Sequence, residues 1–329
     1  MKIGKISNKD LNERIFKNLI SNREEILIGP GIGTDTSVLD FDKDLIVIST
    51  DPITGTSKDL GKLAINISCN DISCVCAEPV GVLISVLLPP CASLEELEEI
   101  IKDANEECIK NNLQIIGGHT EVTDAVNRIV VTTTVVGRVN KKDLPRKNSI
   151  NKGDVLLVSK TIGIEGSLII CNEKKDFLSD KLNLEEINNI INYSESLSVI
   201  NESKIAKKFN VKYLHDVTEG GIYGAIWEVA KANNIKILVN RKSIPLSEST
   251  KKLCDIFKLN PYRLISSGSM LIIMDKDDYK EYIKCCENYN IKITKIGMVD
   301  VGNGAFILDD NDNILKLDEP GPDELYKIY

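Results

Sequence analysis

The chain has 329 residues, of which 42% are hydrophobic and 27% charged, an ordinary composition for a globular protein with room for two domains. Its net charge of −8, with no basic run to offset it, argues against non-specific nucleic-acid binding. No apolar run reaches the ~18 residues of a membrane span, and the N-terminus lacks the apolar core of a signal peptide. Nine cysteines, an odd number, indicate reduced thiols, so we expect a cytoplasmic protein with neither nucleic-acid nor membrane partners.

Strands and helices alternate through the first half of the chain. Ser93 is a good N-cap for the hydrophobic residues at helical spacing behind it, and Glu95 and Glu96 suit the helix dipole. Asp59 is placed to cap the preceding helix, which ends before Pro79. The expected helices span 8–21, 59–77 and 93–108, and the expected strands span 25–28, 37–39, 45–49, 81–88, 113–116 and 128–139.

A polar and basic stretch, residues 140–153, separates this half from the next and is expected to be a linker or a long surface turn. We therefore expect an N-terminal domain over residues 1–140 and a C-terminal domain over 150–329. The expected strands of the second half are 155–159, 211–214, 235–239, 270–274, 291–298 and 305–308. Its expected helices are 161–171, 184–208 with a break near Tyr193, 219–233, 247–257 and 276–289.

Five short motifs place Asp, Glu or His beside Gly or Thr, next to hydrophobic stretches that would be buried. They are Gly29–Asp40, Ser49–Gly55, Asp59–Asp71, Ile115–Asp124 and His215–Gly221. Carboxylates on rigid element ends, beside glycines that let a backbone approach a ligand, suit a site for Mg²⁺ and a polyphosphate. An acidic protein also needs a cation between itself and an anionic nucleotide. The motifs therefore indicate ATP chemistry without a Walker loop.

Three aspartates are the candidate Mg²⁺ ligands. Asp35 follows a glycine-rich turn, Asp51 ends an apolar strand, and Asp71 lies in an otherwise apolar helix, where a carboxylate is costly to bury unless it pairs or binds a metal. Taken singly, each aspartate is better explained as a turn former or a cap, because Asp is common at strand ends. The five motifs together favour the metal site.

Two further groups could meet the phosphates. Lys62 lies one turn into its helix and could reach a phosphate as a point charge, although a solvated helix lysine is an equal reading. The segment Gly117–Glu121 is expected to close a buried strand, where paired glycines would turn backbone N–H groups toward an anion. His119 and Glu121 could then touch metal or phosphate, and the alternative is a plain turn.

The motif His215–Gly221 is expected to end a strand and to start a helix. Asp216 or Thr218 can cap that helix, while the glycines would leave its N-terminus open to an anion or a substrate. Three cysteines in one predicted helix have poor geometry for a metal and are expected to be small buried residues. They are Cys69, Cys74 and Cys76.

The full set of motifs, in this order, resembles the AIR synthase-like (PurM-like) superfamily of ATP-binding proteins. That group includes AIR synthase, selenophosphate synthetase, thiamine-monophosphate kinase, formylglycinamide ribonucleotide amidotransferase and the hydrogenase maturation factor HypE. The segments that carry the resemblance are GIGTDTSVLD, DLGKLAINISCND, GGHTE and HDVTEGG. The second and the last are most similar to the HypE branch.

The resemblance implies a two-domain α/β (α+β) fold, with an N-terminal mixed sheet that pairs into a barrel across a homodimer and a C-terminal α/β sandwich. It implies ATP and Mg²⁺, with the metal held by Asp35, Asp51 and Asp71. It implies nucleotide contacts at Gly31, Gly33, Lys62, Asn70, Gly117, Gly118, Thr120 and Glu121. It implies a substrate cleft shaped by His119, His215, Asp216, Glu219, Gly220 and Gly221.

Three departures bear on activity. Thr34 stands where the family has the first of two aspartates, and His119 stands where it has an acidic residue. The HypE reaction uses a C-terminal cysteine, whereas the last cysteine here is Cys286 and the printed sequence ends PGPDELYKIY, so that reaction is not expected. We expect a HypE-like ATP-dependent enzyme that phosphorylates or activates an oxygen of an unassigned acceptor, with no catalytic residue assigned. The alternatives are a kinase like thiamine-monophosphate kinase and a non-catalytic, nucleotide-binding regulatory protein.

Overall fold

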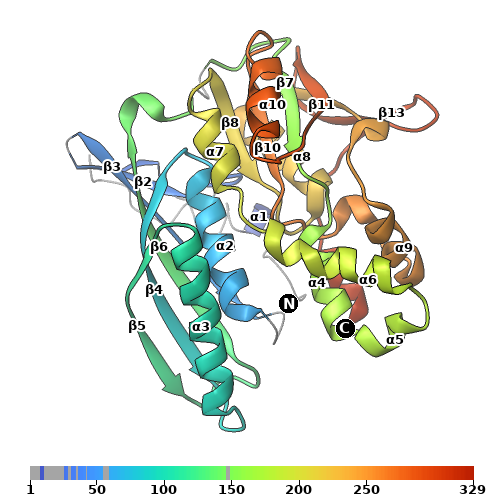
Figure 1. Ribbon diagram of the computed structural model, residues 1–329. Coiled ribbons are helices and arrows are strands. Elements are labelled where there is room, and N and C mark those ends of the chain that lie inside the picture. Colours follow the sequence, from blue (N-terminus) through green and yellow to red (C-terminus); the bar gives the residue numbers. More distant parts are fainter. Residues whose placement is uncertain are drawn as a thin grey trace.

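The computed structural model describes residues 8–10, 26–28, 31–34, 36–41, 43–54, 59–145 and 149–329. Two β-sheets, each with helices packed on it, make up the molecule (Figure 1). Of the helix expected over 8–21, only the turn α1 (Asn8–Asp10) is described, and Asp35 lies outside the described residues. The mixed α/β fold with two sheets confirms the fold class at that level.

The first sheet has six strands in the order β1-β2-β3-β6-β4-β5. Neighbouring strands are antiparallel except β4 and β5, which are parallel and joined by the helix α3 (Leu94–Lys110), because a parallel pair needs a crossover connection. The strands are β1 (Ile26–Ile28), β2 (Ser37–Phe41), β3 (Asp44–Ile53), β4 (Glu78–Leu88), β5 (Gln114–Val122) and β6 (Val130–Asn140).

Two helices cover one face of this sheet. The predicted cap of α3 is confirmed: Ser93 Oγ accepts from the Glu96 N–H at 3.1 Å, and Glu96 Oε2 accepts from the Ser93 N–H at 2.8 Å. The cap predicted for α2 (Leu60–Ser73) is wrong, because Asp59 has a left-handed backbone (φ 57°) and its side chain makes no capping bond. Every residue of α2 except Lys62 is buried, so α2 is the central helix of the molecule.

The second sheet has seven strands in the order β13-β12-β9-β11-β7-β10-β8, of which β9 and β12 are parallel. Its strands are β7 (Val155–Ser159), β8 (Val211–Asp216), β9 (Lys236–Asn240), β10 (Met270–Met274), β11 (Ile293–Asp300), β12 (Gly304–Leu308) and β13 (Ile314–Lys316). The helices with it are α4 (Ile164–Glu173), α5 (Lys175–Ser179), α6 (Leu184–Ile191), α7 (Ile200–Ala206), α8 (Gly221–Asn233), α9 (Glu248–Phe257) and α10 (Tyr279–Glu287).

Both faces of the second sheet are covered, so its central strands β7 and β10 are buried at every position rather than at alternate ones, and all but Ser159 of these residues are hydrophobic. Leu157 and Ile272 face the side of α7 and α10, and their neighbours Leu156 and Leu271 face the side of α8. The first of these two layers is continuous with the core beneath the first sheet. One hydrophobic core therefore ties the two sheets together.

Within the described residues, no helix is both long enough and apolar enough to cross a membrane. The three cysteines of the 69–76 segment are buried, as predicted, and no group of three or more His, Cys, Asp or Glu side chains in the described chain could hold a metal ion. Burial raises the pKa of the Cys76 thiol to about 12, so this thiol stays protonated at neutral pH.

Candidate functional site

Asp51 lies on β3 and Asp71 lies on α2, on the two sides of the contact between this helix and the sheet. Residues 49 and 51 of β3 point to the same side, and residues 68 and 71 of α2 lie on one helix face. The Ser68 hydroxyl donates to Asp51 Oδ2 across 3.5 Å, and the Ser49 hydroxyl donates to Asp71 Oδ2. Two serine–aspartate pairs thus cross the same contact and bring two of the three predicted metal ligands to one place.

A buried hydroxyl chain supports this pair from beneath. Ser68 Oγ and Thr133 Oγ1 are 2.7 Å apart, and Thr133 Oγ1 donates to the Ala64 carbonyl at 3.0 Å. Thr133 lies directly opposite Asp51 in the β3–β6 register and is fully buried. The side chains around Asp51 are therefore fixed by hydrogen bonds to buried groups, which is what a preorganised ligand site requires.

The second sheet adds a third carboxylate on the same side of α2. Cys74, three residues beyond Asp71, donates from Sγ to Asp216 Oδ1 across 3.7 Å. Ser68, Asp71 and Cys74 follow one another at single turns, so Asp51 and Asp216 contact positions about 9 Å apart along the helix. Asp216 is fully buried at the end of β8, two residues beyond the expected end of this strand.

The glycine-rich turn of the first motif packs on the second domain. The Tyr213 hydroxyl donates to the Gly33 carbonyl at 2.6 Å. A Cβ on Gly33 would lie 2.9 Å from Ala232 Cβ and 3.1 Å from the Glu228 carbonyl oxygen, at a left-handed φ of 69°. Glycine is therefore required here for close packing between domains. Gly31 precedes this turn.

The second predicted histidine is also part of this interior contact. His215 Nε2 lies 3.1 Å from Glu228 Oε2, and the His215 side chain is almost completely buried between β8 and α8. The pair holds α8 against the strand that presents Asp216. His215 therefore lies behind the carboxylates, where a positioning role fits better than contact with a substrate.

The N-terminus of α8 is not open, which corrects the expectation for the last motif. The helix begins at Gly221 with Gly220 as its N-cap, so neither Asp216 nor Thr218 caps it. The Gly220 N–H donates to Asp323 Oδ2 at 2.7 Å, and the Tyr326 hydroxyl donates to Glu219 Oε1 at 2.9 Å. The chain's own carboxylate satisfies the helix terminus that was expected to receive an anion.

This contact buries several acidic groups together. Burial raises the pKa of Asp323 to about 6, and it raises the pKa of Glu165, on α4, to about 7. The neighbouring carboxylate of Glu219 adds to both increases. The surroundings of this terminus are thus acidic and unsuited to a second anion.

Two predicted nucleotide contacts on α2 instead hold the domains together. Lys62 pairs with Glu195, which belongs to the short helix η5 (Asn192–Ser196) of the second domain. The Asn70 amide donates to the Leu197 carbonyl at 2.8 Å and accepts from the Val199 N–H at 2.9 Å. Asn70 is completely buried, so these bonds join α2 to the segment that precedes α7.

The segment Gly117–Glu121 was expected to close a buried strand. It instead continues β5, which is the exposed edge strand of the first sheet. The register runs from Asp51 through Thr133 and Ile84 to Gly118, which is three strand spacings, or about 14 Å. Thr120 lies on the same strand. His119 Nε2 is 3.7 Å from Glu121 Oε2, and both side chains are exposed. Within one chain these residues do not join Asp51 and Asp71.

Several residues of this site were not anticipated from the sequence. Ser49 and Ser68 each lie within three residues of a predicted ligand, so their spacing was a usable signal. Asp323 and Glu165 carry no local signal, because only the folding of distant segments brings them to α8.

The family model described as AIR synthase related protein, N-terminal domain, matches residues 33–139, and the corresponding C-terminal domain model matches residues 151–309. A putative hydrogenase expression/formation protein of Methanocaldococcus jannaschii is 29% identical over 286 residues, which cover 84% of this chain and 81% of that protein. A selenide, water dikinase of the same organism is 29% identical over 275 residues, covering 76% and 75%.

Solved structures share the fold. The hydrogenase maturation protein HypE in complex with ATP superposes with a TM-score of 0.73 at 18% identity, covering 99% of this chain and 97% of that one. AaThiL complexed with AMPPCP and TMP superposes with a TM-score of 0.69 at 20% identity, covering 84% and 87%.

Proposed function

We propose that this chain, which belongs to the AIR synthase related protein family, is an ATP-using enzyme that phosphorylates and so activates an oxygen of an acceptor. The observation that carries the proposal is the pair Asp51 and Asp71, held on facing elements by Ser68 and Ser49, with Asp216 of the second domain at the next turn of α2. HypE has a similar fold and has been solved in complex with ATP, which supports the choice of nucleotide.

The residues present fit a Mg²⁺–nucleotide site. Mg²⁺ in such sites takes one or two protein carboxylates and completes its shell with phosphate oxygens and waters. Asp51 and Asp71 supply two carboxylates, and Asp35 is a third candidate outside the described residues. When bound, the ion would neutralise phosphate charge, which the acidic side chains of the site cannot do.

In the proposed reaction the acceptor oxygen forms a bond to the γ-phosphorus of ATP. The bond from that phosphorus to the bridging β–γ oxygen breaks, and ADP leaves with its electron pair. The hydroxyl proton of the acceptor, where there is one, passes to solvent or to a carboxylate. The chain contributes by holding both reactants in line and by keeping Asp51 and Asp71 fixed through Ser68 and Ser49.

A homodimer accounts for the position of the Gly117–Glu121 segment. The face of the first sheet away from α2 leaves apolar side chains partly exposed, with Leu83 at 42%. We expect this face to pair with that of a second subunit, so that Gly117, Gly118, Thr120 and Glu121 reach the nucleotide of the other chain. Sedimentation of the protein and of Leu83→Asp tests this: the variant should be monomeric, and a monomeric parent protein would contradict it.

Calorimetric titration of Mg²⁺–ATP tests the site. Asp51→Asn and Asp71→Asn should each weaken binding by about tenfold or more, because each removes a negative charge from the ion. Asp44→Asn is the matched control, since Asp44 is exposed at the far end of the same strand and should leave the affinity unchanged. Equal affinities in all four proteins would refute the assignment.

One alternative has a specific observation behind it. Thr34 and His119 replace acidic residues of the family pattern, and Lys62 is engaged by Glu195. These features favour a nucleotide-binding regulatory protein without turnover. Measurement of ADP release across a panel of acceptors, thiamine monophosphate among them, separates the readings: release with one acceptor identifies an enzyme, and binding without release identifies the regulatory protein.

A further inference from the structure

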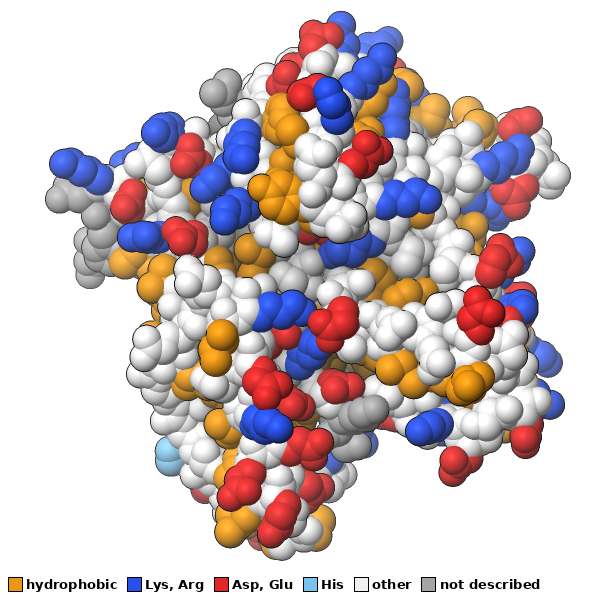
Figure 2. All heavy atoms as spheres, viewed as in Figure 1, with side chains coloured by type: hydrophobic (Ala, Val, Ile, Leu, Met, Phe, Trp, Pro, Cys, Tyr) orange, Lys and Arg blue, Asp and Glu red, His pale blue; other side chains and the backbone are white. Residues whose placement is uncertain are grey.

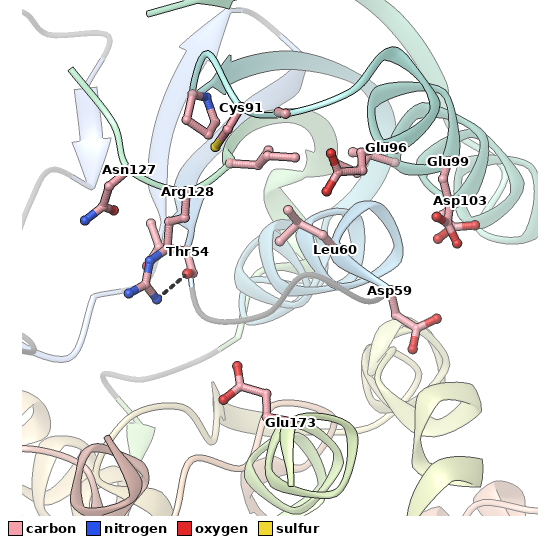
Figure 3. Close-up of a pocket in the computed structure, with 14 residues that line it drawn as sticks. Thr54, Asp59, Leu60, Cys91, Glu96, Glu99, Asp103, Asn127, Arg128 and Glu173 are labelled. Carbon is pink, nitrogen blue, oxygen red and sulfur yellow. Dashed lines mark hydrogen bonds between the residues drawn. The ribbon is translucent and has the colours of Figure 1, made fainter. Parts of the chain in front are cut away.

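A cavity of about 340 Å³ lies between the two domains (Figure 3). Its walls come from the end of β3, the N-terminus of α2, the segment after β4, one face of α3, the segment before β6 and the end of α4. This size and this position between domains are typical of small-molecule sites. The cavity is adjacent to the proposed nucleotide site, because Thr54 in its wall follows Asp51 by three residues, about 10 Å along the strand.

Part of the lining is apolar. Leu60 and Ile100 are buried side chains of α2 and α3 that reach the cavity, and Ile129 lines it from the segment before β6. A ligand seated here would cover hydrocarbon surface, and binding is favoured in proportion to the apolar area removed from water. The cavity therefore favours an occupant with an apolar body over a bare ion.

The polar part of the lining is predominantly negative among the residues that the structure describes. Glu96, Glu99 and Asp103 follow at spacings of three and four, so α3 presents all three on one face toward the cavity. Asp59, which precedes α2, lies on the same side of the cavity as Glu99 and Asp103, and Glu173 from α4 lies toward Thr54 and Arg128 (Figure 3). These carboxylates lie close enough to affect one another. Burial raises the pKa of Asp103, and the charges of Asp59 and Glu99 raise it further. Acidic side chains also gather on the surface over α3 (Figure 2).

The basic residue in the described lining lies on the other side. Arg128 donates to the Thr54 carbonyl at 3.4 Å, and in Figure 3 the two residues are far from Asp103. Arg128 and Glu173 offset each other at the end of the cavity near β3, whereas the end near α3 is strongly negative. A ligand with a cationic end would align along this gradient, with its opposite end toward the strand that carries Asp51.

A metal ion does not fit this cavity. Its carboxylates are spread around a space of hundreds of cubic ångströms, and among the described residues no group of three could hold a metal. An organic ammonium, amidinium or quaternary nitrogen on an apolar body satisfies both parts of the lining at once.

We propose that this cavity binds the acceptor, and that the acceptor is a small organic cation with an apolar body whose reactive oxygen faces Thr54 and Arg128. This inference deepens the proposed function, because identifying the bound cation as the acceptor rests on that function. The binding preference of the cavity stands independently.

The test uses three probes of one shape and different charge: 2-phenylethylammonium, 2-phenylethanol and phenylacetate, titrated into the full-length protein. The cation should bind most tightly and the anion least. Glu99→Gln should weaken binding of the cation about fivefold, the effect of losing one charge contact near water, and leave the neutral probe unchanged. The matched control is Glu98→Gln, an exposed neighbour on α3 outside the cavity. The same comparison is repeated one turn further along α3, with Asp103→Asn as the test variant and Glu106→Gln as its control.

The outcome separates this inference from the proposed function. If Mg²⁺–ATP binds but the three probes bind equally, or if Glu98→Gln weakens the cation as much as Glu99→Gln does, the cationic acceptor site is wrong and the nucleotide site stands. If the cation binds with the expected pattern and Mg²⁺–ATP does not, the cavity is a cation site and the phosphorylation proposal is overturned.

Discussion

Replacement of Glu165 by glutamine should change how the stability of this protein depends on pH. Glu165 lies in the first turn of α4 and is completely buried, and its Oε2 has no hydrogen-bond partner among the described residues. Ser267 contacts the carboxylate, and the charges of Asp323 and Glu219 face it from the C-terminal segment and from the turn before α8. A carboxylate in these surroundings is stabilised in its protonated form.

The magnitude follows from the pKa. Burial, with a smaller contribution from Asp323 and Glu219, raises the pKa of Glu165 from 4.5 to about 7. Between these values the folded protein holds a proton that the unfolded chain has released, so the free energy of unfolding falls as pH rises. A rise of this size corresponds to about 3 kcal/mol, lost between pH 4.5 and roughly pH 7.5.

Urea unfolding at intervals from pH 4.5 to pH 8 measures the effect. Glutamine cannot titrate, so the difference in unfolding free energy between Glu165→Gln and the parent should move by about 3 kcal/mol in favour of the variant across this range. A constant offset from repacking the amide does not affect this change. The control is Glu248→Gln, an exposed glutamate in the first turn of α9, whose curve should run parallel to that of the parent.

Parallel curves for Glu165→Gln and the parent protein would refute the reasoning. They would mean that Glu165 is ionised in the folded state, with a partner or a water molecule that offsets its burial. The acidic contact between Asp323 and the terminus of α8 would then need another explanation.

Three further substitutions test the contacts between segments. Asn70→Ala should lower the free energy of unfolding by about 2–4 kcal/mol, because two buried backbone groups lose their partners; a loss below about 0.5 kcal/mol in urea unfolding would contradict this. Gly33→Ala should cost about 1–3 kcal/mol, since its Cβ would meet Ala232 at a left-handed backbone, and an unchanged melting temperature would be the contrary result. Tyr326→Phe removes the hydrogen bond to Glu219 and should increase proteolysis of the C-terminal segment; equal cleavage rates would show that this bond does not hold it.

Local sequence patterns predicted most elements because local forces decide them. The capping residues Ser93 and Glu96 and the hydrophobic spacing behind them define α3 without any tertiary contact. Asp51 and Asp71 were also identifiable as candidate ligands, since each lies in a motif of its own, although the motifs do not encode the serine contacts that bring them together. The expectation failed at Gly117–Glu121, because whether a strand ends or continues as a sheet edge depends on what lies beside it.

The mixed α/β class, the apolar central helix and the carboxylates available for a nucleotide site follow from local patterns, because periodicity, capping and the high cost of a lone buried charge are local properties. Which of those groups meet depends on how the whole chain packs. This packing placed Asp216 beside α2, used Lys62 and Asn70 to join the domains, and brought Asp323 to the terminus of α8. These contacts join residues 103 to 142 positions apart in the sequence. No short pattern encodes them, because chain segments that far apart meet only through packing of the whole core.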